Sequence, residues 1–166
     1  MNGDNFTGVS IFQIEKKVDT GAIIYQEKLE IQKEDNFQTL SSKLSDLGSK
    51  TLIKSLRLIE NDNLKLLVQN DKKSSSAPKI KKEMLRINWS WQADKINNWV
   101  RGLSPFPSMY TVYKGKNFKI FKTYVLDKDS KLSPGKIEIT SLMEMFVHSA
   151  DKIISILAIQ QEGKKK

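Results

Sequence analysis

The chain has 166 residues, which is the length of one ordinary domain or of two small ones. It contains no cysteine and a single histidine, so disulfides, thiolate chemistry and multi-histidine metal sites are excluded. Lys and Arg number 28 against 19 Asp and Glu, a net charge of +9 at pH 7. Because no apolar run is long enough to span a membrane and the N-terminus has no signal-peptide pattern, we expect a cytoplasmic protein without a membrane partner.

The first third of the chain predicts two strands followed by one long helix. Residues 9–14 and 22–31 are rich in β-branched and aromatic residues, and a polar stretch separates them. From Phe37 to Leu56 apolar residues recur at three- to five-residue steps, the pattern of an amphipathic helix. We expect this helix to end near residues 61–63.

A linker and a second helix follow. Residues 69–79 are polar and have no apolar period, as is typical of a linker. Beyond them, the pattern predicts a helix over about 91–102, with Ser90 as its N-cap and with Ile96 and Val100 facing inward. Gly102 and the two prolines after it end the helix.

The remaining residues predict short antiparallel strands. Lys114-Gly115-Lys116 and Pro134-Gly135 have the composition of turns. The strands expected around them are 109–113, 117–126, 136–140, 143–148 and 153–159. Five short strands at this spacing favour a small antiparallel barrel over an open sheet.

The positive charge lies entirely in the second half of the chain. Residues 1–70 carry 9 basic and 10 acidic side chains, whereas residues 71–166 carry 19 and 9. Such an asymmetry indicates contact with a polyanion, because lysines near phosphates release condensed counterions. Lysine outnumbers arginine 25 to three, a bias that A/T-rich codon usage and simple solvation of the surface also explain. Any nucleic-acid contact should therefore be to phosphates rather than to base edges.

The strongest single candidate for chemistry is Asp19, which stands in Val-Asp-Thr-Gly between the first two strands. The same residues are also good turn formers, and spacing alone favours that structural role. An aspartic-protease dyad is excluded because the chain holds no second Asp-Thr-Gly or Asp-Ser-Gly. His148 is more typical of a structural histidine than of a catalytic base. The three tryptophans and Phe106 are expected in the core, with base stacking as the alternative.

Six short motifs in register resemble methionyl-tRNA formyltransferases. They are Asn2-Gly3-Asp4, Thr7-Gly8-Val9-Ser10-Ile11, Val18-Asp19-Thr20-Gly21-Ala22-Ile23-Ile24, Ala77-Pro78-Lys79-Ile80, Arg86-Ile87-Asn88-Trp89-Ser90 and Val100-Arg101-Gly102-Leu103-Ser104-Pro105-Phe106-Pro107. Each motif is weak alone, and together they extend over nearly the whole chain.

The resemblance implies an α+β fold in three parts. Residues 1–66 would be the C-terminal remnant of a Rossmann-like formyltransferase domain, with strands plus one long helix. Residues 67–84 would be a basic linker. Residues 85–166 would form an antiparallel OB-like β-barrel, truncated at its end.

The resemblance also implies a reaction. The family transfers a formyl group from 10-formyltetrahydrofolate to the amino group of methionine on initiator tRNA. Its catalytic set is an Asn, a His and an Asp, of which only Asp19 has a counterpart here. The Asn-x-His element should precede Thr7 and is absent from the sequence, as is most of the folate pocket. We therefore expect the 166 residues alone to be inactive, and an N-terminal fragment of the same enzyme is a second expected partner.

Two alternatives remain open. In one, the chain is a non-catalytic module that binds tRNA through its linker and barrel. The lysines expected at the tRNA are Lys72, Lys73, Lys79, Lys81, Lys82, Lys114, Lys116 and Lys119. In the other, the chain is a relative of sugar-nucleotide formyltransferases, against which the tryptophan and proline motifs and the basic linker argue.

Overall fold

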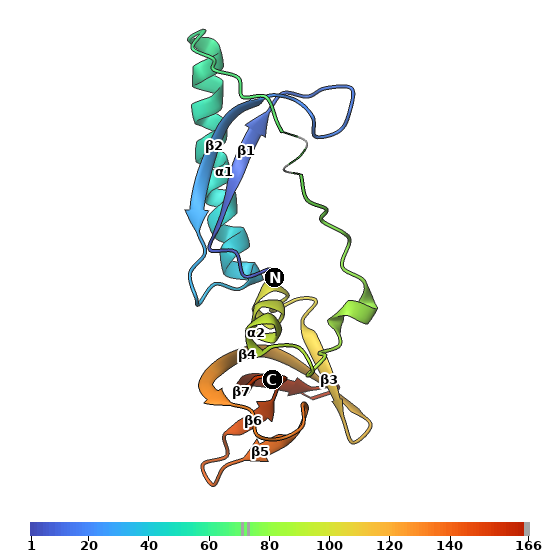
Figure 1. Ribbon diagram of the computed structural model, residues 1–166. Coiled ribbons are helices and arrows are strands. Elements are labelled where there is room, and N and C mark those ends of the chain that lie inside the picture. The colour runs from blue at the N-terminus through green and yellow to red at the C-terminus, as the bar shows by residue number, and fades with distance from the viewer. Residues whose placement is uncertain (71, 73, 165–166) are drawn as a thin grey trace. The chain divides into compact units, whose positions relative to one another are not determined.

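The computed structural model describes residues 1–70, 72 and 74–164 of the chain (Figure 1). The chain folds into two compact units. We call Asp4–Glu34 with Thr39–Pro78 the N-terminal unit. We call Lys79–Lys166, with Met1–Gly3 and Asp35–Gln38, the C-terminal unit. Helices and strands both occur, so the predicted α+β class is confirmed at that level.

The N-terminal unit contains the two strands and the long helix that the sequence predicts. Strands β1 (Phe6–Phe12) and β2 (Ile23–Glu30) pair antiparallel, from Phe6 opposite Glu30 to Phe12 opposite Ile23. Side chains of β1 alternate between exposed and half-buried, as expected for a strand with one covered face. Helix α1 (Phe37–Glu60) ends where the sequence predicts.

One side of α1 lacks cover within the described chain. Thr51 and Ser55 are fully buried, and their hydroxyls donate hydrogen bonds to the carbonyls of Leu47 and Thr51, one turn earlier. In contrast, several large apolar side chains of this helix are 43–52% exposed. They are Phe37, Leu52, Ile53, Leu56 and Ile59. A helix with apolar residues on more than one face is normally covered on both sides.

The described residues of the C-terminal unit form one α-helix, one short 3-10 helix and five strands. They are η2 (Lys82–Leu85), α2 (Ala93–Gly102), β3 (Met109–Tyr113), β4 (Lys116–Asp129), β5 (Ile137–Ile139), β6 (Met145–His148) and β7 (Lys152–Gln161). The strand order is β3-β4-β7-β6-β5, and every pairing is antiparallel. All five predicted strands are therefore present; β3 has the predicted ends, and the other four differ from their predicted ranges by a few residues.

The closed barrel is not confirmed. Strands β3 and β5 are the two edges of the sheet, and no pairing joins them among the described residues. The outer side of β3 receives only an isolated parallel bridge between Arg86 and Tyr110, with Ile87 N–H bonded to Tyr110 O at 2.8 Å. The described strands thus form an open sheet, in which β3 and β5 do not pair.

The core of this unit lies between α2 and the sheet. Ile96 and Val100 of α2 are completely buried and belong to the same apolar cluster as Met109, Ile120 and Ile154. The three tryptophans pack against this cluster, as predicted. The prediction for Phe106 was wrong, because this residue is 76% exposed. It lies beyond the end of α2, between two prolines, so the helical spacing that suggested a buried position no longer applies there.

The start of α2 also differs from the sequence prediction. The helix begins at Ala93, and Ser90 is not its N-cap. The Ala93 N–H instead donates to Asp151 Oδ1 at 2.8 Å, a residue 58 positions later in the chain. Asp151 Oδ1 also accepts from Lys152 N–H at 2.8 Å and from Ser149 Oγ at 2.9 Å. A carboxylate in the turn before β7 therefore caps a helix that is remote in sequence.

These contacts fix the charge state of the cap. Burial alone would raise the pKa of Asp151, but the hydrogen bonds from Ala93 N–H, Ser149 Oγ and Lys152 N–H outweigh it and lower the pKa below its ordinary value. A lowered pKa in the folded state stabilises the fold above the unfolded-state pKa of about 3.9. This contribution is lost as the pH falls through the folded-state pKa.

Replacing the cap should destabilise the C-terminal unit. Asp151→Ala should lower the free energy of unfolding by about 1 kcal/mol near neutral pH, as is typical for loss of an N-cap. The difference should shrink as the pH falls below about 4, where the unfolded state takes up its proton, and vanish once the pH has passed the lower folded-state pKa. Urea unfolding followed by circular dichroism at several pH values measures both effects. Asp151→Asn keeps an acceptor oxygen, so its free energy of unfolding should fall less than that of Asp151→Ala. An equal fall in both variants would contradict the assignment of the Asp151 side chain as the cap of α2.

Candidate functional site

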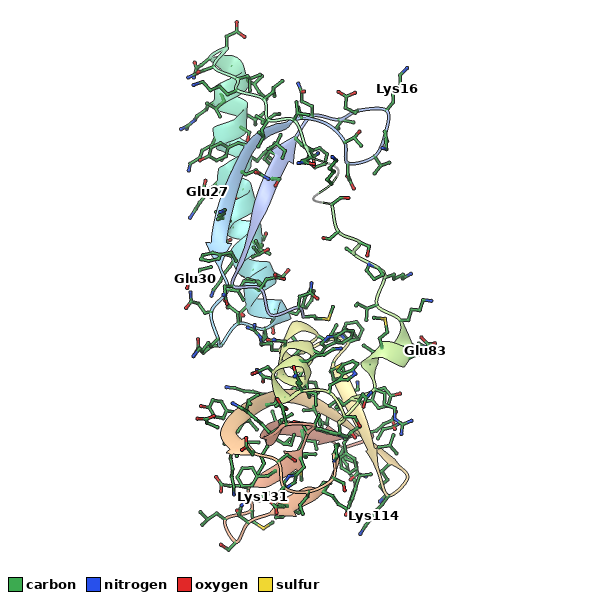
Figure 2. All side chains as sticks on the ribbon, viewed as in Figure 1. Lys16, Glu27, Glu30, Glu83, Lys114 and Lys131 are labelled. Carbon is green, nitrogen blue, oxygen red and sulfur yellow. The ribbon has the colours of Figure 1, made fainter. Side chains whose placement is uncertain are left out.

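Asp19 lies in the loop that joins β1 to β2 in the N-terminal unit. The loop is closed at its base by a hydrogen bond from Gln13 N–H to Ala22 O of 2.9 Å. At its end, Thr20 Oγ1 donates to Lys17 O at 2.9 Å. Asp19 itself has a φ of 59°, in the left-handed region that Asp tolerates better than most residues. Figure 2 shows the loop extending away from the two strands, with Lys16 on its outer side.

Gly21 is a residue of this loop at which no side chain fits. It is buried, and a Cβ added there would lie 1.7 Å from Gln13 O. The backbone of Gln13 therefore approaches Gly21 more closely than any side chain allows. Turn chemistry and a functional carboxylate are compatible here, because the turn places Asp19 at an exposed position next to this close contact.

A segment distant in sequence holds the same loop. Gln69 Nε2 donates to Gly21 O at 2.7 Å and to Asp19 O at 3.0 Å. Just before it, Leu67 and Ile23 exchange two backbone hydrogen bonds of 2.9 and 2.8 Å. Residues 67–69 are thus held against the start of β2 and the Asp19 loop within the N-terminal unit. Sequence reasoning missed Gln69, because a single glutamine at the start of a polar stretch carries no local pattern.

The lone histidine occupies a structural position in the C-terminal unit. His148 is 1% exposed at the end of β6. Its Nδ1 lies 2.9 Å from Ser130 Oγ and 3.4 Å from Leu132 N, and its Nε2 lies 3.4 Å from Glu138 Oε2. These neighbours support the interpretation of His148 as a core histidine.

The candidate tRNA-binding lysines are solvent-exposed wherever the structure describes them. Lys72, Lys79, Lys81 and Lys82 lie before and at the start of η2, whereas Lys73 lies outside the described residues.

The other three belong to the β3–β4 hairpin. Lys114 is in its turn, with a φ of 48°, and Figure 2 shows its side chain extending from the hairpin tip. Lys116 begins β4, and Lys119 precedes the buried Ile120, so Lys119 lies on the opposite face of the strand. Within the described chain, none of these lysines forms a salt bridge, so their charge remains available to an external anion.

Among the described residues, no three His, Asp or Glu side chains are grouped as metal ligands. No helix there is both long and apolar enough to cross a membrane.

The chain belongs to the formyl transferase family. Residues 1–56 match the family model described as "Formyl transferase". Residues 79–166 match the one described as "Formyl transferase, C-terminal domain". Both Asp19 and the β1–β2 pair lie inside the first match, and the whole five-stranded sheet lies inside the second.

Among curated proteins, the chain is 36% identical over 166 residues to a methionyl-tRNA formyltransferase of Caldanaerobacter subterraneus. The match covers 100% of this chain and 53% of that protein. Methionyl-tRNA formyltransferases of other organisms match at a similar level over a similar share. The chain thus spans about half the length of the curated relatives that it matches.

Two solved structures share the fold at lower sequence identity. HypX from Aquifex aeolicus in complex with tetrahydrofolic acid has a TM-score of 0.67 at 16% identity, covering 98% of this chain and 28% of that one. An N-formyltransferase from Helicobacter canadensis, in complex with folinic acid and dTDP-3-aminofucose, has a TM-score of 0.67 at 20% identity. That match covers 92% of this chain and 56% of the other.

The close contact at Gly21 gives a test of the Asp19 loop. Gly21→Ala should open the loop, because the added Cβ has no room beside Gln13 O. Limited trypsin digestion should then cleave faster after Lys16 and Lys17. Gly48→Ala is the matched control, since its Cβ would lie 4.0 Å from the Val9 methyl groups, an ordinary contact. Cleavage at the same rate in both variants would contradict the constraint at Gly21.

Proposed function

We propose that this chain is the C-terminal portion of a methionyl-tRNA formyltransferase. The observation that carries the proposal is the match over all 166 residues to curated methionyl-tRNA formyltransferases, at 36% identity. The longer enzyme would form a bond between the amino nitrogen of methionyl-tRNA and the formyl carbon of 10-formyltetrahydrofolate. The bond from that carbon to N10 of the folate would break, and one proton would leave the amine and one reach N10.

Asp19 is the residue of this chain that we assign to the reaction. Its carboxylate would orient a histidine or a water that accepts the proton from the attacking amine. The exposed position of Asp19, on a loop fixed by Gly21 and Gln69, is consistent with that role. The Asn-x-His element of the family is not among the 166 residues, so the chain by itself would not transfer formyl groups.

Additional polypeptide would complete the catalytic domain. The exposed apolar side chains of α1 support this, since Leu52, Ile53 and Leu56 are each about half exposed. We assign residues 1–66 to that domain, 67–84 to a basic linker and 85–166 to an OB-like barrel domain. The order of the five antiparallel strands supports the assignment of an OB-like barrel domain, although the edge strands β3 and β5 do not pair with each other among the described residues.

The basic residues are assigned to the tRNA. Lysines in the linker and on the β3–β4 hairpin are exposed and lack carboxylate partners within the described chain, which supports contacts with phosphates. Binding of tRNA by these lysines would not require catalysis. The alternative proposal is therefore that the chain is a non-catalytic tRNA-binding module.

Salt dependence tests the tRNA assignment. The 166-residue chain should bind initiator tRNA with an affinity that falls steeply as KCl rises, because binding releases counterions. The triple variant Lys114→Gln, Lys116→Gln, Lys119→Gln should weaken binding and reduce the slope of log affinity against log salt by roughly two to three. Fluorescence anisotropy of labelled tRNA over a salt series measures both.

The control removes the same charge from the other unit. Lys28→Gln, Lys33→Gln, Lys50→Gln changes three exposed lysines of the N-terminal unit and should leave the slope nearly unchanged. Binding that is absent or independent of salt would contradict the proposal, and so would equal slopes in the two triple variants.

A further inference from the structure

We propose that the C-terminal unit holds a second binding site, an apolar cavity that takes the hydrocarbon chain of a medium-chain carboxylate and pairs its head group with Arg86. The cavity lies wholly within residues 86–159 and has a volume of about 340 Å³. That value is at the lower end of the range for small-molecule pockets, about 300–1,000 Å³. The inference does not depend on formyl transfer or on tRNA binding.

The walls come from every strand of the sheet and from the segment before α2. Aliphatic side chains dominate, with one or two from each strand; examples are Val112, Ile120, Ile137, Val147 and Ile156. The edge strands β3 and β5, which do not pair with each other among the described residues, both contribute to the lining. Val112 and Ile139, from these two strands, are 41% and 61% exposed and lie at the accessible part of the lining.

Apart from Arg86, the polar side chains in the walls are Trp89, Thr111 and Tyr113. Trp89 Nε1 donates to Thr111 Oγ1 at 3.1 Å, which satisfies the single donor of the indole. A nucleobase or a sugar would leave its own donors and acceptors unpaired against such walls, which costs more than an apolar contact gains. A hydrocarbon chain has no such groups to satisfy.

Arg86 is the one charged residue in the lining. It is exposed and forms no salt bridge with any described carboxylate. A guanidinium binds a carboxylate through two parallel hydrogen bonds, with a geometry that lysine does not offer. An apolar cavity bordered by a single unpaired guanidinium therefore fits a monoanionic amphiphile and disfavours a neutral or cationic one.

A chain-length series tests the site. Isothermal titration calorimetry of the 166-residue chain with hexanoate, octanoate and decanoate, each below its micellar concentration, should show binding that tightens about fourfold per added methylene until the cavity is full. Decanol should bind more weakly than decanoate, and decylammonium should bind more weakly still. No binding of decanoate, or affinities that do not depend on chain length, would overturn the proposal.

Three variants distinguish the contribution of the Arg86 charge to binding from that of the apolar cavity. Arg86→Gln should weaken decanoate binding about tenfold while decanol binding is unchanged. Arg57→Gln, an exposed arginine of the N-terminal unit, is the matched control and should change neither. Val112→Phe should fill part of the cavity and weaken both ligands. Thermal unfolding confirms that each variant is folded; decanoate binding that Arg86→Gln leaves intact would contradict the assigned head-group contact.

Discussion

The C-terminal unit depends on β7, because this strand pairs with β4 on one side and with β6 on the other. Its residues Ile154 and Ile156 are buried and belong to the same apolar cluster as Ile120 of β4 and Val147 of β6. The turn that precedes β7 supplies Asp151, whose carboxylate caps α2. Strand β7 and the turn before it therefore determine the strand order and the position of α2. The same sheet carries the exposed lysines of the β3–β4 hairpin and the walls of the apolar cavity.

The two units differ in how fully their large apolar side chains are buried. The C-terminal unit has a buried core between helix and sheet, whereas α1 of the N-terminal unit keeps large apolar side chains about half exposed. Burying such side chains stabilises a fold by roughly 1.5–3 kcal/mol each, so their exposure is a considerable loss. The charge is also divided unequally: residues 71–166 carry the basic surplus, whereas residues 1–70, which include Asp19, have nearly balanced charge.

Local patterns predicted the elements well, and long-range interactions account for what they missed. The strands, α1 and the buried face of α2 followed from periodicity, since apolar spacing reports which face is covered. The cap of α2 could not be predicted, because Asp151 is 58 residues from Ala93. Gln69, which holds the Asp19 loop from 50 residues away, was missed for the same reason. Barrel closure depends on pairing between edge strands, about which strand spacing contains no information.

We propose that Asp19 acts in formyl transfer once the rest of the catalytic domain is supplied. The direct measurement uses a chimera in which these 166 residues replace the matching part of the Caldanaerobacter enzyme, with which they share 36% identity. We expect formyl-methionyl-tRNA from the chimera, a fall of at least about 100-fold in kcat for Asp19→Asn, and no product from the 166 residues alone. A folded Asp19→Asn chimera as active as its parent, or product from the 166 residues alone, would contradict it.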